Sequence, residues 1–333
     1  MIAFRSPKAG GRNKIARNER SGTMKVLVLG GRGFVGSNVV ETLRNSDHEA
    51  TPISKRDGLD LTDYEATRAT FEKHAPEAIV NVAANVGSLN YVTEQAATVF
   101  DQNMRMLLNV FRAAQEVLPD SVLVTPIANC GYPGNLVNYV EDKFWEGKVH
   151  QSVLSYGSTR RMIDVLSECY LMQHGYKSVN FFVPNMYGPH DSTDPNKAHA
   201  LNALISKTVK AKREGKNELE VWGSGVAIRE WLYAADFGRI VKLALDTHED
   251  NVFNETFNVA QNSGLSVRNL VEIIVEESGF EGEIVWNRNM PDGAPRKVMD
   301  DARFRKVFPD FEFMDFREGI RATSRYYESV YPY

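Results

Sequence analysis

The chain has 333 residues, of which 43% are hydrophobic and 25% are charged, and its formal net charge is −4. This composition is typical of a globular protein, and no apolar run approaches the ~20 residues that a membrane helix needs, so we expect no membrane partner. The two cysteines, Cys130 and Cys169, are too few for a disulfide framework and show no zinc-ligand spacing with the seven histidines, so we expect a cytoplasmic protein without a metal.

The first 23 residues differ in charge from the rest of the chain. They contain six basic residues, Arg5, Lys8, Arg12, Lys14, Arg17 and Arg20, against one acid, Glu19. The remainder is therefore acidic, which argues against a nucleic-acid partner. Residues 1–23 could be a transit peptide or an RNA-binding arm. Because Met24 stands directly before the first predicted strand, we favour a disordered basic extension upstream of the folded chain.

A glycine-rich turn follows the first predicted strand, Lys25–Leu29. Gly30, Gly33 and Gly36 are spaced by two residues each, and Val35–Leu43 has apolar residues at helical spacing. Strand, glycine turn and helix in this order form a cradle for a dinucleotide, whose phosphates bind at the helix N-terminus. The expected cofactor contacts in this stretch are Gly30, Arg32, Gly33, Phe34, Val35 and Gly36.

Basic residues stand where the adenosine ribose is expected. Lys55 and Arg56 occupy the position at which an NAD-preferring site usually has an acid for the ribose 2′-OH. Together with Arg32 they suit a 2′-phosphate, so we expect NADP (NADPH), although Lys55 and Arg56 could also be solvated loop charges. Asp60 and Leu61 follow, and we expect them at the adenine edge.

Strands and helices alternate through the first half of the chain. Strands are predicted at Glu49–Ser54, Glu77–Ala83, Ser121–Ile127 and Lys177–Val183, and helices at Thr62–His74, Thr93–Val117 and Leu154–Gln173. Pro52 places its strand near an edge of the sheet. This alternation predicts an α/β fold with a Rossmann doubly wound parallel sheet. Ala83 and Ala84 lie at a strand end that should face the cofactor.

The pattern changes to loops and short elements beyond Pro184, with a basic helix at Lys197–Glu214 and a final helix at Phe316–Tyr327. No linker or repeat is visible. We therefore expect a dinucleotide-binding domain over residues 24–183, which takes further strands from the C-terminal half. Residues 184–333 would mainly form a smaller, interleaved α/β lobe that binds the substrate.

Tyr156 and Arg160 lie four residues apart, on one face of a predicted helix. A phenol titrates near ~10, so it needs a nearby cation to act as an acid or base at neutral pH, and Arg160 can supply that charge. The alternative is a surface stack of the two side chains. After a dinucleotide-binding half, the catalytic interpretation is favoured.

Cys130 follows the fourth strand, where open parallel sheets place their ligands, and a thiol there can move a proton at a carbon beside a carbonyl. His190 follows the next strand end and would complete a pair. The alternatives are a small buried cysteine and a loop histidine. Arg229, Arg296 and Lys297 in the C-terminal loops could hold a diphosphate or remain solvated.

These segments resemble the extended short-chain dehydrogenase/reductase superfamily of the NAD-dependent epimerase/dehydratase type, and within it the GDP-L-fucose synthase family. The resemblance covers Met24 to about Tyr327. It is carried by Gly30–Gly36, Arg56–Leu61, Ala83–Gly87, Cys130–Pro133, Asn185–Asp191, Trp222–Gly225 with Arg229 and Glu230, and Asp292–Lys297. Enzymes of that family epimerise GDP-4-keto-6-deoxymannose at C3 and C5 and then reduce C4 with NADPH.

The resemblance implies a role for each candidate residue. Tyr156 would be the acid of the reduction, Cys130 and His190 would be the epimerisation pair, and Arg32 would contact the 2′-phosphate. It also implies a homodimer through the two long helices. The expected contacts with the GDP-linked sugar are Asn185, His199, Trp222, Arg229, Arg296 and Lys297, of which Arg229 and Lys297 would hold the diphosphate.

Two positions depart from the family pattern. The lysine expected four residues after the tyrosine is Arg160, which keeps the charge but is a poorer proton-relay partner. The serine expected before the Cys130 segment is Ala128, which cannot hydrogen-bond a keto oxygen, and losing such a donor typically costs ~3 kcal/mol. The amide of Asn129 could replace that donor in part.

The epimerising pair is thus complete while the reducing group is altered. We expect a nucleotide-sugar epimerase, an NADPH-dependent 4-keto reductase, or both in one enzyme, acting on a GDP-4-keto-6-deoxyhexose. The alternatives are a redox-neutral epimerase and an NADP-binding pseudoenzyme or regulatory protein, against which the retained Cys130 and His190 argue. A 4,6-dehydratase is disfavoured because Ala128 and Asn129 stand where that reaction needs an acidic pair.

Overall fold

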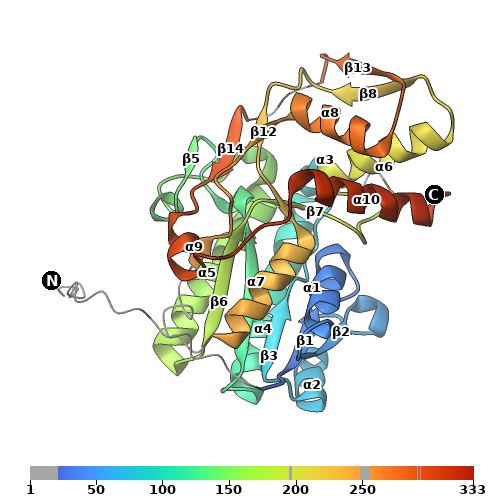
Figure 1. Ribbon diagram of the computed structural model, residues 1–333. Helices are drawn as coiled ribbons and strands as arrows, with labels where there is room; N and C mark the ends of the chain where they lie inside the picture. Colours follow the sequence, from blue (N-terminus) through green and yellow to red (C-terminus); the bar gives the residue numbers. More distant parts are fainter. Residues whose placement is uncertain (1–21, 195–196, 248–255, 291, 293) are drawn as a thin grey trace.

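The computed structural model describes residues 22–194, 197–247, 256–290, 292 and 294–333, so most of the predicted extension lies outside the described residues. A parallel sheet runs through the larger part of the molecule, in the order β11-β6-β4-β3-β1-β2 (Figure 1). Its strands are β1 (Lys25–Leu29), β2 (Glu49–Ile53), β3 (Ala78–Asn81), β4 (Val122–Ala128), β6 (Ser178–Val183) and β11 (Thr256–Asn258). Pro52 lies in β2, at the edge of this sheet, as expected.

Helices cover both faces of the sheet. They are α1 (Phe34–Arg44), α2 (Tyr64–His74), α4 (Ala96–Val117), α5 (Leu154–His174) and α7 (Ala234–Asp246). Alternate residues of β1 explain the two layers: Val26 and Val28 pack in the cluster formed with α1 and α7, whereas Leu27 and Leu29 pack with α2 and α4. The predicted doubly wound α/β fold is confirmed.

The helix predicted over Thr93–Val117 is two helices, which corrects the prediction. α3 spans Leu89–Glu94, and α4 begins at Ala96 after a break at Gln95. Ser88 caps α3, and the Ser155 hydroxyl donates a hydrogen bond to the Val92 carbonyl at 2.9 Å. This contact turns the short helix towards the start of α5, away from the line of α4.

The C-terminal half builds a smaller lobe beyond the carboxyl end of β6 (Figure 1). The helix α9 (Ala302–Val307) packs against β11 of the large sheet, whereas the helices of the lobe are α6 (Ala200–Arg213), α8 (Val267–Ser278) and α10 (Phe316–Val330). Its strand pairs are β7 (Asn185–Tyr187) with β10 (Trp231–Tyr233) and β8 (Glu218–Trp222) with β13 (Glu283–Asn287). A further sheet has the order β12 (Leu265–Ser266), β9 (Ile228–Arg229), β14 (Arg296–Met299) and β5 (Asn138–Tyr139).

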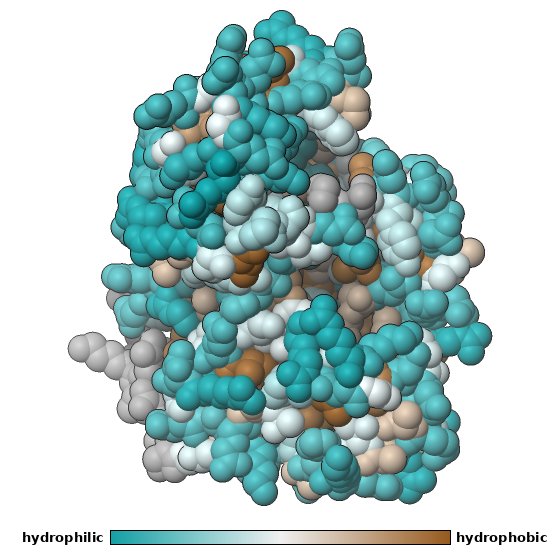
Figure 2. Space-filling view, turned by 90° about the vertical axis from the view of Figure 1, so that its right-hand side faces the viewer, coloured by the Kyte–Doolittle hydropathy of each residue, from teal (hydrophilic) through white to brown (hydrophobic). Residues whose placement is uncertain are grey.

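The two halves of the chain are interleaved, because β11 joins the large sheet and β5 joins the sheet of the C-terminal lobe. The exact boundary at residue 183 stays a prediction. The molecular surface is hollowed between the large sheet and the lobe, on the face shown in Figure 2. Among the described residues, no helix is both long and apolar enough to cross a bilayer.

Candidate active site

The glycine turn between β1 and α1 has the geometry that a dinucleotide needs. Gly30 has a φ of +74°, and a Cβ there would lie 3.0 Å from the Ala83 backbone. At Gly36 a Cβ would lie 2.2 Å from the Gly30 carbonyl oxygen, so α1 packs directly on the turn. Gly33 precedes α1 and offers no side-chain cap, which leaves the helix N-terminus open to a phosphate. These residues therefore fit the expected cofactor.

Acids lie beside two of the basic side chains at the position expected for the adenosine ribose, so the positive charge there is smaller than the sequence suggested. Arg32 donates from Nε to both carboxylate oxygens of Asp57, at 2.6 and 2.8 Å. Lys55 lies 3.1 Å from Asp60. Hydrogen bonds from Thr62, with help from Lys55, lower the pKa of Asp60 to about 2. The contacts of these bases with the cofactor stay predictions, and sequence reasoning missed Asp57, which directly follows Arg56. The adenine contacts proposed for Asp60 and Leu61 stay predictions.

Tyr156 and Arg160 share one face of α5, as their spacing predicted. The Arg160 guanidinium carbon lies 4.9 Å from the centroid of the Tyr156 ring. Arg160 is only 4% exposed, so the pair is not a surface stack. Burial raises the pKa of Tyr156, and the charge of Arg160 acts in the opposite direction. The phenol is therefore a proton donor at neutral pH.

Asn103, on α4, is a site residue that sequence reasoning missed. Its side-chain oxygen accepts a hydrogen bond from Arg160 Nη2 at 3.2 Å and another from the Asn85 backbone N–H at 3.1 Å. Its amide nitrogen donates to the Asn85 carbonyl at 2.8 Å. Asn103 thus connects α5 with the loop after β3, where Ala83 and Ala84 lie. An asparagine on the apolar face of the amphipathic helix α4 was the signal that could have indicated it.

Cys130 lies in a short turn, Asn129–Gly131, directly after β4. Burial raises the pKa of its thiol to about 11, against the opposing charges of Lys297 and Arg160. The Tyr156 phenol also interacts with this thiol. The structure therefore brings Cys130, Tyr156, Arg160 and Lys297 into one neighbourhood. Asn129 is buried in the same turn, and its amide role stays a prediction.

The predicted diphosphate ligands lie side by side in the C-terminal lobe. Lys297 on β14 pairs in register with Arg229 on β9. Arg229 donates from Nη2 to the Asp292 carbonyl at 3.1 Å, and burial lowers the pKa of both cations. Two half-buried cations that lie side by side favour an anionic ligand. Further expected contacts lie at Asn185, which starts β7, at Trp222, which ends β8, and at Arg296, which starts β14.

The two candidate histidines occupy different surroundings. His190 Nε2 lies 2.9 Å from a carboxylate oxygen of Glu41 on α1, and its ring packs 5.2 Å from that of Tyr326. These contacts hold His190 against α1 and α10, and its pairing with Cys130 in epimerisation stays a prediction. The histidine lies over the middle of α1, because Glu41 is seven residues after the helix start at Phe34.

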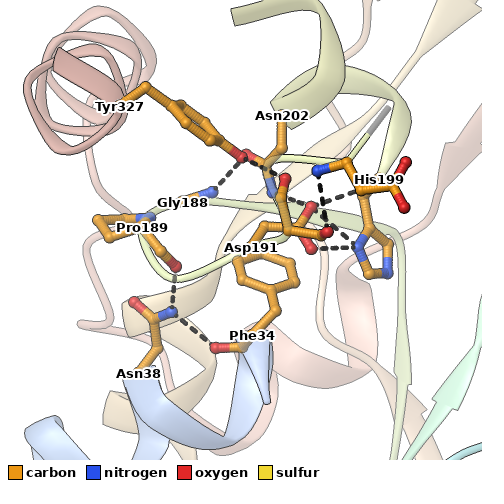
Figure 3. A network of polar contacts seen from close by, with 10 residues as sticks. Phe34, Asn38, Gly188, Pro189, Asp191, His199, Asn202 and Tyr327 are labelled. Atoms are coloured by element: carbon orange, nitrogen blue, oxygen red, sulfur yellow. Dashed lines mark hydrogen bonds and ion pairs between the residues drawn. The ribbon is translucent and has the colours of Figure 1, made fainter. Parts of the chain in front are cut away.

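His199 is a second candidate for the epimerisation pair and lies in the polar network of Figure 3. Its Nδ1 lies 3.1 Å from Asp191 Oδ2, and its ring lies 5.1 Å from that of Phe34, the first residue of α1. Burial opposes ionisation of Asp191, yet hydrogen bonds from His199 and Asn202 hold the pKa of this carboxyl below its usual value. The carboxylate fixes the ring orientation and leaves Nε2 for proton transfer.

Comparison with known proteins agrees with this geometry. The model of the NAD dependent epimerase/dehydratase family matches residues 26–260. The chain belongs to this family. Similar proteins include probable GDP-L-fucose synthase 1 of Oryza sativa subsp. japonica, 29% identical over 91% of this chain and 92% of that protein. GDP-L-colitose synthase of Yersinia pseudotuberculosis is 27% identical over 91% of this chain and 98% of that protein.

Solved structures of similar fold belong to enzymes of nucleotide sugars. A GDP-L-fucose synthetase from Naegleria fowleri has a TM-score of 0.82 and 24% identity, over 92% of this chain and 94% of that chain. The same synthetase bound to NADP has a TM-score of 0.79. A GDP-6-OMe-4-keto-L-xylo-heptose reductase from C. jejuni has a TM-score of 0.82 and 20% identity, over 94% and 99%. The predicted family and its fold are therefore confirmed.

Proposed function

We propose that this family member is an NADP(H)-dependent enzyme of GDP-linked 4-keto-6-deoxy sugars, in which epimerisation is the dominant reaction and reduction is slow. The observation that carries the proposal is the neighbourhood of Cys130, Tyr156 and Lys297, which combines proton-transfer groups with a half-buried cation. Relatives that are named as synthases of GDP-L-fucose and GDP-L-colitose support the substrate class.

Epimerisation next to a ketone needs two proton-transfer groups on opposite faces of the sugar. One group removes the proton from the carbon, the electron pair moves onto the keto oxygen, and the other group returns a proton from the opposite face. Cys130 carries its proton at neutral pH and can return it. His199, oriented by Asp191, is the second group. Lys297 and Arg229 would hold the diphosphate and so fix the sugar between them.

The groups that would reduce the ketone are less complete than the groups that would epimerise the sugar. NADPH, when bound, supplies the hydride, and the Tyr156 phenol supplies a proton to the keto oxygen. Ala128 provides no hydroxyl beside that oxygen, and Arg160 is held by Asn103 and cannot exchange its proton near neutral pH. Transition-state stabilisation by hydrogen bonds is therefore reduced. This reasoning favours fast proton exchange and slow hydride transfer.

A homodimer is part of the proposal. Apolar side chains stand exposed along α4 and α5, namely Phe100, Leu108, Val165 and Met172, and their exposed fractions run from 38% to 85%. Such a surface is typical of an interface between subunits. Light scattering after size-exclusion chromatography should give twice the mass of the chain, whereas a monomer at micromolar concentration would contradict this part.

The test is an incubation of the purified protein with NADPH and GDP-4-keto-6-deoxymannose in deuterated water. We expect deuterium at C3 and C5, together with slow loss of NADPH absorbance. Cys130→Ser is the matched variant, which should bind NADPH like the unmodified protein but lose the deuterium signal. If neither signal appears with this substrate or with related GDP-keto sugars, the enzymatic proposal is wrong and the pseudoenzyme alternative holds.

A further inference from the structure

The loop after β2 holds an acid, Asp57, that contacts the glycine turn. Asp57 lies within hydrogen-bond distance of Arg32 in the glycine turn, as described above, and it also closes a capping box with Ser54. The Ser54 N–H and hydroxyl both donate to Asp57 Oδ2 at 3.0 Å. Slight desolvation opposes ionisation, but hydrogen bonds from Arg32 and Ser54 hold the pKa of Asp57 below its usual value. The side chain is therefore a fixed carboxylate at neutral pH.

Most of the positive charge in this loop is already neutralised. Arg32 is paired with Asp57, and Lys55 is paired with Asp60. Among the described residues, Arg56 makes no ion pair through its side chain and is exposed. Of the three bases that suggested a 2′-phosphate site, Arg56 is thus the one that no ion pair with a described residue neutralises.

Resting on the proposed use of a nicotinamide dinucleotide, we propose that Asp57 determines cofactor specificity and keeps the preference for NADPH over NADH small. In the β1–α1–β2 arrangement the adenosine ribose lies between the glycine turn and the end of β2. Asp57 Oδ1 accepts one hydrogen bond, from Arg32, and has a lone pair for the ribose 2′-OH. The same carboxylate repels a 2′-phosphate, which Arg56 attracts. The site therefore accepts both dinucleotides.

A purely structural role for Asp57 would have the opposite consequence. Because Arg32 donates to Asp57 through Nε, its two terminal nitrogens could still turn to a phosphate. If the carboxylate only holds Arg32 in place for NADPH, its removal weakens NADPH binding. If it opposes the 2′-phosphate, removal strengthens NADPH binding and weakens NADH binding. The sign of the change therefore separates the two roles.

The experiment measures dissociation constants for NADPH and NADH by fluorescence titration, and for 2′,5′-ADP and 5′-AMP by displacement. The unmodified protein should prefer NADPH by less than about tenfold. Asp57→Asn should bind NADPH about three- to fivefold tighter and NADH about three- to fivefold weaker, the range of exposed charge contacts. Arg56→Ala should remove the preference for NADPH. 2′,5′-ADP and 5′-AMP should follow the same pattern, since they differ only in the 2′ group.

Ser54→Ala is the matched control, because it removes a hydroxyl from the same capping box and leaves the carboxylate. It should leave the ratio of the two dissociation constants unchanged. A ratio in Asp57→Asn within twofold of the unmodified protein would overturn the inference, as would weaker NADPH binding or an equal shift in Ser54→Ala. Binding of neither dinucleotide to the unmodified protein would overturn the proposed cofactor as well.

Discussion

The glycine turn and the candidate catalytic site are built in different ways. We call the candidate site around Cys130, Arg160 and Lys297 the rim. In the turn, Gly36 contacts the backbone of Gly30, and Gly30 contacts the backbone of Ala83 on the neighbouring strand end, so the structure depends on what these glycines lack. At the rim, Arg160 is held by Asn103, and the charge that acts most strongly on Cys130 comes from Lys297. The rim therefore depends on side chains from distant parts of the chain. The turn tolerates almost no substitution. At the rim, one hydrogen-bond donor can be replaced by another, which changes the balance between epimerisation and reduction.

The largest expected effect comes from Gly36→Ala. A Cβ at this position would lie 2.2 Å from the Gly30 oxygen and 2.7 Å from the Gly31 Cα, and neither backbone atom can move without displacing α1. We expect a loss of roughly 3 kcal/mol of unfolding free energy and no detectable NADPH binding. Urea unfolding and fluorescence titration measure the two effects.

Gly33→Ala is the control variant with which Gly36→Ala is compared. Its Cβ would lie 3.2 Å from the Gly30 oxygen, so the fold should change little while the pyrophosphate is held away from the backbone. Normal stability and normal NADPH affinity in Gly36→Ala would show that the turn is less constrained than the structure indicates.

The next largest effect separates the two histidines. His199→Asn should lower deuterium exchange at the sugar by at least about 100-fold, because a proton-transfer group is lost. His190→Asn should leave exchange within a few-fold, since its partner is Glu41. NMR of the sugar in deuterated water provides the rates. The reverse order of the two variants would place His190 in the epimerisation pair instead of His199.

The sequence predicted most of what depends on local pattern. The bounds of β1 were predicted without error, and so were the edge position of Pro52 and the shared face of Tyr156 and Arg160. The break in the helix at Gln95 was missed, because it depends on a contact from Ser155, sixty residues away. Asp57 and the choice between the histidines depend on contacts between side chains, which hydrophobic periodicity does not report.

A smaller effect concerns the reactivity of the two thiols. Because burial raises the pKa of Cys130 to about 11, its alkylation by iodoacetamide at pH 7.5 should be at least about tenfold slower than that of the exposed Cys169. The rate should rise with pH towards 11. The raised pKa of Cys130 also lowers the free energy of unfolding as the pH rises towards 11, because the unfolded chain releases the thiol proton at a lower pH than the folded chain. Mass spectrometry of timed samples compares the two residues, and equal rates would contradict the burial of Cys130.

The smallest expected effect restores part of the reduction. Ala128→Ser returns a hydroxyl to the end of β4 and should raise the rate of NADPH consumption several-fold. Deuterium exchange should rise as well, because epimerisation moves an electron pair onto the same keto oxygen. Stopped assays of NADPH absorbance and of deuterium content separate the two rates. An unchanged NADPH rate would mean that the missing hydroxyl does not limit hydride transfer.

The most direct test of the central claim is the ratio of two initial rates in one sample of the unmodified protein. Deuterium incorporation at C3 and C5 and oxidation of NADPH are followed together, with GDP-4-keto-6-deoxymannose as substrate. A complete epimerising pair beside an altered reducing site should give at least about ten exchange events for each NADPH oxidised. One NADPH oxidised for every exchange event, or faster oxidation than exchange, would contradict the account.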